Sequence, residues 1–530
     1  MYDLVIKNGT VIDGSGSKRF RNDIAVKDGI IVKLAQNIEE GAKEVIDARG
    51  LFVSPGFIDT HTHSDSTVFS DRTTGYNHLE DGVTTELAGQ CGTMAAPYYG
   101  DYNPACGVSE EEYKEACASY RSFFDYVSGR KLGTNLAFFA GQGNIRGKVM
   151  GYGPGEPGES QLEEMRRLMA EAMEAGCLGF STGLVYTPSV FAGTRELIEI
   201  ARVAKSMGGV YTTHIRGEGL TLIPSIEEAL EIGRASGIPV NISHIKVIGH
   251  ALEGKSQEVI ELLEKNMKDG MVITADQYPF TGGSAPLLSQ IPPKYITHGR
   301  EQAVKDLKDP HIREKMLYSI MNEPREFESN IYSAGFEGSL IAGASKTPQF
   351  VGKTLSQIAE MTGKTPFDAC CDLLIENDGF VQGIYLSQNE SDMLAFLSTP
   401  WVMAGSDWSD YGAPDDPEKQ GGGHPRGMAT MVRRLELVRS HGLYTLEQAI
   451  YRLTGMPSEV YGLGMRGFIK EGYAADITIF DYDGLRCNAD YEHPFRRNDG
   501  IKYVLVNGKT AVKDGRFQNV FGGRPVKMER

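Results

Sequence analysis

The residues GFIDTHTH (56–63) are the first clear indication of how this chain folds. The run begins with apolar, β-rich residues and ends on two histidines, His61 and His63, which stand two positions apart. Side chains along a strand alternate between its two faces, so residues i and i+2 point the same way. We therefore expect a strand that carries two imidazoles on one side of its end, an arrangement that lets both reach one metal ion.

Seven further apolar runs follow along the chain. They are VTTELAGQCG (83–92), NLAFFAGQGNIR (135–146), CLGFSTGLVY (177–186), GVYTTHIRGE (209–218), VNISHIKVIG (240–249), MVITADQYPF (271–280) and WVMAGSDW (401–408). Segments with apolar residues at helical spacing separate several of them, for example ESQLEEMRRLMAEAMEAG (159–176), which ends on a glycine. Eight strand runs with intervening helices predict an α/β fold with a TIM-like (β/α)8 barrel over residues 55–464.

Both ends of the chain show short β-rich runs that alternate with turn signals. DLVIKNGTVIDG (3–14) contains an Asn-Gly pair between apolar runs, which is typical of a hairpin. DIAVKDGIIVKLA (23–35) and YVLVNGKTAVKDGRF (503–517) repeat the plan. We expect residues 1–54 and 465–530 to build one small β-sandwich domain together. Residues 282–346 break the strand–helix alternation and are predicted to form an inserted lid subdomain over the barrel mouth.

The overall composition narrows the class of protein. The 530 residues are 41% hydrophobic and 23% charged, and the net charge is −16. These values are typical of a soluble globular protein and argue against binding to nucleic acid or to an anionic membrane surface. We expect no secretory signal and no membrane span. The cysteines are scattered and odd in number, seven in all, which favours free thiols and a cytoplasmic location. The oligomeric state stays open.

Four more candidate ligands or catalytic groups end the later runs. Cys91 ends the second run, His214 the fifth, His244 the sixth and Asp407 the eighth. In a barrel of this type the carboxyl ends of the strands converge at one face, where active sites lie. A lone histidine in a strand is more often a hydrogen-bonded core residue, and Asp407 alone could be a helix cap. The joint pattern instead predicts a metal site, and imidazole and thiolate ligands favour zinc.

Cys91 has a second interpretation, as a nucleophile. A catalytic thiol needs a base to activate it, and a histidine could serve. The remaining strand-end histidines and Asp407 would then have no use, so the metal-ligand interpretation explains more of the pattern. Removal of metal separates the two, because thiol chemistry would survive it.

Taken together, these motifs resemble the amidohydrolase superfamily, and specifically its N-acyl-D-amino-acid deacylase (D-aminoacylase) branch. The resemblance covers nearly the whole chain. It rests on PGFIDTHTHSD (55–65), GQCG (89–92), GFSTGLVYTPS (179–189), THIRGEG (213–219), SHIK (243–246), DQYPFTGGS (276–284), GSD (405–407), HPR (424–426) and GYAADITIFD (472–481). PGFIDTHTH alone indicates only the superfamily, whereas the elements with Cys91, STGL, SHIK and DQYPF indicate the branch.

The resemblance implies an activity and a ligand set. The activity is zinc-dependent hydrolysis of the amide bond of an N-acyl-D-amino acid, which releases a carboxylate and a free D-amino acid. His214, His244 and Cys91 would hold one Zn2+ tightly. His61 and His63, sharing Cys91, would form a weaker second site. The preference for D over L substrates follows from the resemblance alone.

Substrate-binding residues are carried over in the same way. By resemblance, Lys246, Tyr278 and Ser284 hold the free α-carboxylate of the small-molecule substrate, and Asp407 is the general base and acid. Arg426 is a further candidate, because a guanidinium binds a carboxylate through two hydrogen bonds; its alternative role is a salt bridge that fastens a loop. Tyr186 could donate to the scissile carbonyl, or it could be a packed aromatic residue.

Two rival functions and one specificity prediction complete the interpretation. A cyclic amidase of the hydantoinase or dihydropyrimidinase kind would use much of the same metal chemistry, but it would not need the carboxylate-binding set. A non-catalytic scaffold should have lost ligands, and this chain retains them. The acidic segment WSDYGAPDDPEKQGGG (408–423) predicts that substrates with acidic side chains are disfavoured.

Overall fold

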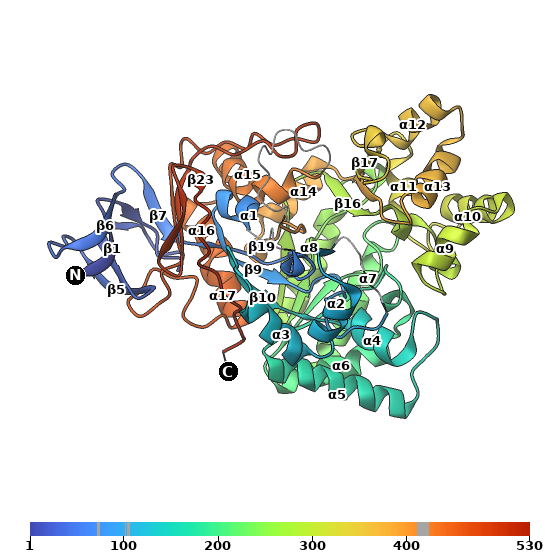
Figure 1. Ribbon diagram of the computed structural model, residues 1–530, viewed down its shortest axis with the longest axis horizontal. Helices are drawn as coiled ribbons and strands as arrows, with labels where there is room; N and C mark the ends of the chain where they lie inside the picture. Colours follow the sequence, from blue (N-terminus) through green and yellow to red (C-terminus); the bar gives the residue numbers. More distant parts are fainter. Residues whose placement is uncertain (71–74, 101, 103–105, 411–422, 530) are drawn as a thin grey trace.

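The structure is a computed structural model, and it describes residues 1–70, 75–100, 102, 106–410 and 423–529 (Figure 1). Its middle part consists of parallel strands that alternate with helices. The strands are β8 (Phe57–Asp59), β9 (Val83–Ala88), β10 (Asn135–Phe138), β11 (Ala140–Gly141), β12 (Gly179–Gly183), β13 (Val210–His214), β14 (Val240–Ile242), β15 (Ile273–Gln277) and β19 (Val402–Ala404). The chain therefore has a mixed α/β fold.

These strands form two parallel sheets, in the orders β10-β9-β8 and β11-β12-β13-β14-β15-β19. Backbone hydrogen bonds also join the two sheets. The N–H of Thr60 donates to the carbonyl of Ala404 at 3.1 Å, and the N–H of Leu178 donates to that of Phe138 at 2.8 Å. The carboxyl ends of β8 and β19 consequently lie side by side.

Helices lie between the parallel strands and after the last of them. They are α1 (Tyr76–Glu80), α2 (Glu110–Ala116), α3 (Tyr120–Ser128), α4 (Gln142–Met150), α5 (Glu159–Ala175), α6 (Thr194–Ser206), α7 (Leu222–Ser236), α8 (Lys255–Lys268), α14 (Glu390–Ser398), α15 (Arg426–His441), α16 (Leu446–Leu453) and α17 (Gly455–Tyr461). The helix predicted over 159–176 is confirmed as α5. Its apolar residues, such as Leu162, Met165 and Met169, are buried, and it ends at Gly176, whose φ of 119° suits glycine.

One predicted strand run extends too far. Residues 135–146 were expected to be one run, but the chain leaves the strand after Gly141 and continues as α4. This helix lies close to the segment after β9, since a Cβ on Gly143 would lie 2.7 Å from the carbonyl oxygen of Gly92. It also carries the fully buried Arg146 to an ion pair with Glu196 of α6. Long-range pairing therefore overrides the local apolar pattern here.

Strands from both ends of the chain meet in one sheet, with the order β23-β22-β21-β20-β7-β2-β3. A second sheet, β5-β4-β1-β6, comes from the N-terminal residues alone. The bounds are β1 (Tyr2–Lys7), β2 (Thr10–Val11), β3 (Phe20–Arg21), β4 (Asp23–Lys27), β5 (Ile30–Ala35), β6 (Ala42–Asp47), β7 (Phe52–Pro55), β20 (Ile477–Phe480), β21 (Ile501–Val506), β22 (Lys509–Lys513) and β23 (Arg516–Phe517). In Figure 1 the blue and red strands lie together at the left.

Two of the three hairpins predicted in these sheets are present, and one is not. Asp28-Gly29 joins the antiparallel pair β4 and β5, and Asn507-Gly508 joins β21 and β22, as expected. The hairpin at Asn8-Gly9 is wrong, because β1 and β2 belong to different sheets. Asn8 bonds to Asp23 and Asp47 instead, and Gly9 lies so close to β7 that a Cβ would be 2.5 Å from Val53 Cγ2.

The residues after β15 form a separate layer, seen at the right of Figure 1. β16 (Gly282–Pro286), β17 (Ser339–Gly343) and β18 (Gln382–Leu386) make an antiparallel sheet in the order β16-β18-β17. The accompanying helices are α9 (Arg300–Asp306), α10 (Pro310–Asn322), α11 (Asn330–Ala334), α12 (Leu355–Thr362) and α13 (Pro366–Glu376). These residues have their own hydrophobic cluster, which runs from Ala285 to Tyr385 and so continues beyond residue 346.

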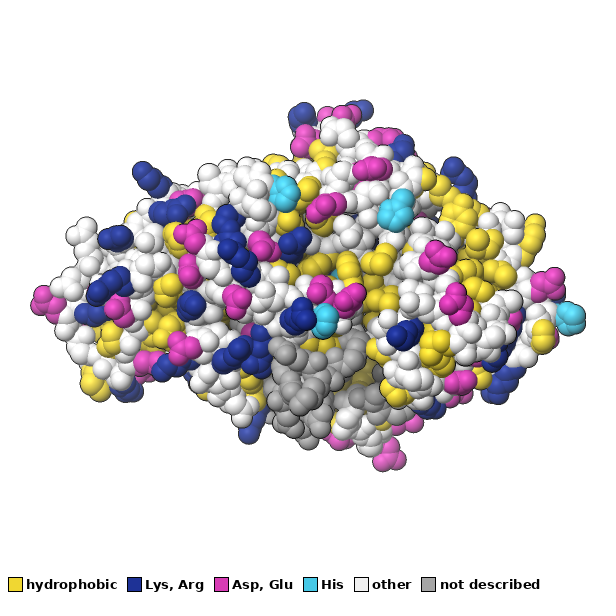
Figure 2. All heavy atoms as spheres, turned by 90° about the horizontal axis from the view of Figure 1, so that it is seen from above, with side chains coloured by type: hydrophobic (Ala, Val, Ile, Leu, Met, Phe, Trp, Pro, Cys, Tyr) yellow, Lys and Arg dark blue, Asp and Glu magenta, His cyan; other side chains and the backbone are white. Residues whose placement is uncertain are grey.

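Surface and thiol properties add three facts. The face in Figure 2 carries acidic and basic side chains intermixed, without one large basic patch. None of the helices that the structure describes has both the length and the apolar character needed to cross a membrane. All seven cysteines are free thiols, in agreement with the expectation from their number and spacing.

Candidate metal centre

The candidate site lies at the carboxyl ends of the parallel strands. His214 is the last residue of β13. His61, Cys91, His244 and Asp407 come two or three residues after β8, β9, β14 and β19. Two of these segments are hydrogen-bonded to each other, because the N–H of Asp407 donates to the carbonyl of His61 at 2.8 Å. Residues far apart in sequence are thereby held around one point.

Three of these residues have an unusual backbone conformation. The φ angles are 53° for Cys91, 36° for His244 and 53° for Asp407. The other described non-glycine residues with positive φ are all Asn or Asp, which tolerate this region best. Cys91 and His244 are therefore the unusual members, and such strain costs on the order of 1–3 kcal/mol per residue. The sharp turn after each strand directs these side chains toward the site.

Cys91 is at the centre of the histidines. Its Sγ lies 3.3 Å from His61 Nε2, 3.7 Å from His214 Nδ1 and 3.4 Å from His244 Nε2. Around a tetrahedral zinc ion, a thiolate at about 2.3 Å and an imidazole nitrogen at about 2.0 Å would be roughly 3.5 Å apart. The donor atoms thus have the types and separations that a metal ion requires. Ligand atoms of His61, Cys91, His244 and Asp407 all lie within 4.8 Å of one another.

The electrostatics of this cluster favour an ionised thiol. Burial acts to raise the pKa of Cys91, but the charges of His61 and His244 and the hydrogen bond from His214 bring it well below its usual range. Burial opposes charge on His61 as well, yet the charges of Asp276 and Cys91 raise its pKa well above the ordinary value. A thiolate is the form that binds metal, so the protein environment prepares Cys91 as a ligand.

Two carboxylates contact the outer sides of the histidine rings. Asp276 Oδ1 lies 3.2 Å from His61 Nδ1, and Glu218 Oε1 lies 3.1 Å from His244 Nδ1. Partners of this kind orient metal-ligating imidazoles and select their tautomers. Neither residue was predicted from the sequence, although each lies within a motif named above. Glu218 is in THIRGEG and Asp276 is in DQYPFTGGS. The sequence signal that could have indicated them is a carboxylate that closely follows a strand-end histidine or that lies at the end of a neighbouring strand.

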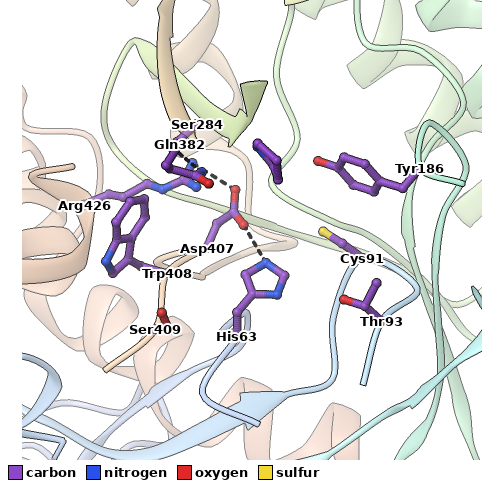
Figure 3. A pocket seen from close by; sticks show the side chains of 11 residues that line it. His63, Cys91, Thr93, Tyr186, Ser284, Gln382, Asp407, Trp408, Ser409 and Arg426 are labelled. Carbon is purple, nitrogen blue, oxygen red and sulfur yellow. Dashed lines mark hydrogen bonds and ion pairs between the residues drawn. The ribbon is translucent and has the colours of Figure 1, made fainter. Parts of the chain in front are cut away.

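Asp407 is held between two cationic side chains. Its Oδ1 lies 3.1 Å from His63 Nε2, and its Oδ2 lies 2.9 Å from Arg426 Nη1 (Figure 3). Burial acts to raise the pKa of Asp407, but Arg426, His244 and His63 lower it well below its usual range. Asp407 is therefore ionised and close to the ligand cluster. His61 Nε2 also lies 3.6 Å from Asp407 Oδ1, so both histidines of the first run lie close to this carboxylate.

A cavity of about 440 Å³ opens beside these groups. Cys91, Asp407 and His63 line it together with the predicted substrate residues Tyr186, Ser284 and Arg426. In Figure 3 the hydroxyl of Tyr186 points toward the middle of this space.

A smaller adjoining cavity completes the predicted set. Lys246 and Tyr278 line it, and it shares Tyr186, Ser284 and Asp407 with the larger cavity. Every site residue expected from the sequence therefore lies in one neighbourhood. Residues 411–422, which form most of the acidic segment predicted to disfavour acidic substrates, lie outside the described residues.

The polar groups of these residues have specific partners. The hydroxyl of Ser284 donates to the carbonyl of Gly383 at 2.8 Å and accepts from the amide of Gln382 at 2.9 Å. Tyr278 accepts a hydrogen bond from Gln388 at 3.2 Å. Gln382, which also lines the larger cavity, belongs to β18 and had no motif to indicate it.

Arg426, the first residue of α15, contacts two aromatic rings and one carboxylate. Its guanidinium lies over the rings of Tyr278 and Trp408, 4.5 and 5.3 Å from their centroids. Its buried Nε has no hydrogen-bond partner among the described residues. Arg426 forms an ion pair with Asp407 and lines the larger cavity.

Comparisons with known proteins identify the family to which the chain is similar. The profile of the amidohydrolase family matches residues 44–512. A D-aminoacylase from Alcaligenes xylosoxydans xylosoxydans is 30% identical over 525 residues, which cover 99% of this chain and 97% of that protein. An N-acyl-D-glutamate deacylase from the same organism is 30% identical over 507 residues, covering 96% and 93%.

A solved structure extends the similarity to three dimensions. The N-acyl-D-glutamate deacylase of Bordetella bronchiseptica, crystallised with zinc and a phosphonate mimic of the reaction's tetrahedral intermediate, superimposes with a TM-score of 0.81. It is 29% identical to this chain, and 99% of each chain is covered. With a profile match over most of the chain and a site at the strand ends, the chain belongs to the amidohydrolase family.

Proposed function

We propose that this protein is a metal-dependent hydrolase that cleaves the amide bond of N-acyl-D-amino acids, releasing a carboxylate and a free D-amino acid. The observation that carries the proposal is the position of Cys91 Sγ, which faces three imidazole nitrogens beside the ionised Asp407. The names of the two relatives, a D-aminoacylase and an N-acyl-D-glutamate deacylase, support the substrate class.

Zinc is the proposed metal, because thiolate and imidazole are the ligands that it favours. His214, His244 and Cys91 would hold one ion tightly, and His61 and His63 would complete a weaker site that shares Cys91. A zinc ion bound there supplies Lewis acidity, which acidifies water and polarises a carbonyl group.

Asp407 would carry the proton. Its carboxylate is ionised and is held beside the ligand cluster by His63 and Arg426, so it can accept a proton from the attacking water. The same carboxyl group then returns the proton to the amine nitrogen as the amide bond breaks. Tyr186, whose hydroxyl points into the cavity, is placed to donate a hydrogen bond to the scissile carbonyl.

The α-carboxylate of the substrate would bind among Lys246, Tyr278, Ser284 and Arg426. Two cations in the walls of adjoining cavities suit an anion, and the Nε of Arg426 is a buried donor without a hydrogen-bond partner among the described residues. A hydantoin or dihydropyrimidine ring has no free carboxylate, so this set favours a linear substrate over that of a hydantoinase.

We also propose the finer architecture. The parallel strands β8 to β19 would close as a (β/α)8 barrel over residues 55–464, which the hydrogen bonds between β8 and β19 support. Residues 1–54 and 465–530 would form a β-sandwich, and the layer that begins at residue 282 would be a lid. The free thiols favour a reducing compartment such as the cytoplasm.

A panel of paired N-acyl-D- and N-acyl-L-amino acids, assayed on protein of measured metal content, tests the function. We expect kcat/KM for the D form to exceed that for the L form by at least about tenfold, equivalent to ~1.4 kcal/mol. N-acetyl-D-Glu and N-acetyl-D-Asp in the panel test the prediction that substrates with acidic side chains are disfavoured. Faster hydrolysis of a hydantoin than of every linear amide would contradict the proposal.

A further inference from the structure

Glu218 occupies a position between the two later histidines. It follows β13, and its side chain is buried. Its Oε1 lies 3.1 Å from His244 Nδ1, and its Oε2 lies 3.8 Å from His214 Nε2. The opposite ring nitrogens, His244 Nε2 and His214 Nδ1, face Cys91. One carboxylate thus lies on the outer side of both rings, while the thiol lies on the inner side.

Lys246 competes for the same ring nitrogen of His244. Its Nζ lies 2.8 Å from His244 Nδ1, 2.9 Å from the carbonyl oxygen of His244 and 2.5 Å from Glu218 Oε1. An ammonium group can only donate. If it donated to Nδ1, the proton of the neutral ring would move to Nε2, the nitrogen that faces Cys91. If Glu218 accepts from both groups, the proton stays on Nδ1.

We propose that Glu218 is a positioning residue that keeps the proton of His244 on Nδ1 and thereby leaves Nε2 free for the metal ion. The inference rests on the proposed metal site. It also assigns a task to Lys246 near the metal: its charge holds Glu218, and Glu218 in turn prevents Lys246 from reversing the tautomer of His244.

The inserted layer holds Glu218 in this place. Glu328, which precedes α11, accepts hydrogen bonds from the N–H of Glu218 at 2.8 Å and from that of Gly219 at 2.6 Å. Glycine at position 219 makes room, since a Cβ there would lie 2.9 Å from Glu328 Oε2. A carboxylate from the insertion therefore fixes the segment that carries the positioning carboxylate.

Direct ligation by Glu218 is the alternative, since atoms of His214, Glu218 and His244 also lie within 4.8 Å of one another. The position of Lys246 argues against it. Its ammonium already lies 2.5 Å from Glu218 Oε1 and 2.8 Å from His244 Nδ1, where a cation bound to both would have to be. Like charges repel, so a metal ion on this side would require Lys246 to leave.

The test measures the affinity of the metal-stripped full-length protein for Zn2+, by competition with a chromophoric chelator. Glu218→Gln keeps the shape of the side chain and removes its charge, and we expect the affinity to fall by roughly 10–100-fold. The double variant Glu218→Gln with Lys246→Met should recover most of this loss, because no ammonium remains to donate to Nδ1 and so displace the ring proton to Nε2. Lys246→Met alone should lower the affinity far less than Glu218→Gln does, because Glu218 remains ionised and can still accept from His244 Nδ1.

A matched control is Glu228→Gln, which neutralises another carboxylate, one that pairs with Arg216 and accepts from Thr194. Its affinity for zinc should be unchanged, and circular dichroism should show that all variants fold. Wild-type affinity in Glu218→Gln, or a loss that the double variant does not recover, would overturn the inference and leave the proposed function standing. A wild-type protein that binds no zinc would overturn both.

Discussion

The guanidinium of Arg426 is paired with the carboxylate of Asp407, with 2.9 Å between Nη1 and Oδ2, and both side chains are buried. The proposed proton carrier and a proposed carboxylate binder therefore interact directly. The pair keeps Asp407 ionised and holds it toward the histidines.

Asp407→Asn should keep the metal but lose most of the turnover, by roughly 10²–10⁴-fold. Asparagine tolerates the positive φ of this position, so the variant should fold. Kinetics and metal analysis on the same preparation check the prediction. Near-wild-type kcat would remove Asp407 from the mechanism.

Arg426→Met should shift the acidic limb of the pH–rate profile. Without the guanidinium the pKa of Asp407 rises toward its ordinary value, so activity is lost at a higher pH as the solution is acidified. Because Arg426 is also a proposed carboxylate binder, KM should rise. Arg426→Lys is the control that retains charge, and its acidic limb should move less. An unchanged profile in Arg426→Met would show that the ion pair does not control the carboxyl group.

Cys91→Ala should lose metal and activity together, because its thiolate faces all three imidazole nitrogens. Cys117→Ala is a matched control, since Cys117 is another buried free thiol, which packs in the main hydrophobic cluster. That variant should lose a little stability and keep its metal. Full metal content in Cys91→Ala, measured by elemental analysis, would make Cys91 a packing residue.

Exhaustive chelation should abolish hydrolysis, and Zn2+ should restore it. The reason is that the thiol, the imidazoles and a carboxylate lie together in the arrangement that a metal ion requires. A catalytic thiol would need only one base beside it. The control is enzyme treated with the same chelator after the chelator has been saturated with metal ions. Activity that survives rigorous metal removal would favour the nucleophilic cysteine instead.

Arg19→Met should lower the stability of the fold by an amount that depends on pH. The hydrogen bond from Arg19, 2.6 Å between Nε and Oε1, lowers the pKa of Glu447 to about 2. A lowered carboxyl pKa stabilises the fold above the unfolded value of 4.5, and this contribution disappears as pH falls toward 2. The difference in Tm between wild type and variant should therefore be largest near neutral pH and shrink below 4.5. Arg167→Met, which breaks an exposed pair on α5, should change Tm very little.

Much of the site could be predicted from the sequence because it consists of local signals. His61, Cys91, His214, His244 and Asp407 each end an apolar run, and a parallel α/β fold brings such ends together by its architecture. Helix α5 could also be predicted from the sequence, since the spacing of its apolar residues and its terminal glycine are local features.

Other features depend on residues that are distant in sequence. The turn signal at Asn8-Gly9 was present, but only contacts with Asp23, Asp47 and Val53 decide that β1 and β2 enter different sheets. The partition of residues 135–146 between strand and helix likewise depends on Gly92 and Glu196.

The sequence by itself determined the strand–helix alternation and the chemical identity of the candidate ligands, because periodicity and residue type are carried by neighbouring positions. Only the tertiary structure decided which nitrogen of each histidine faces Cys91, that Glu218 lies between His244 and Lys246, and that Arg426 pairs with Asp407. Those relationships depend on backbone turns and on angstrom-scale distances between separate segments, and no local pattern encodes them.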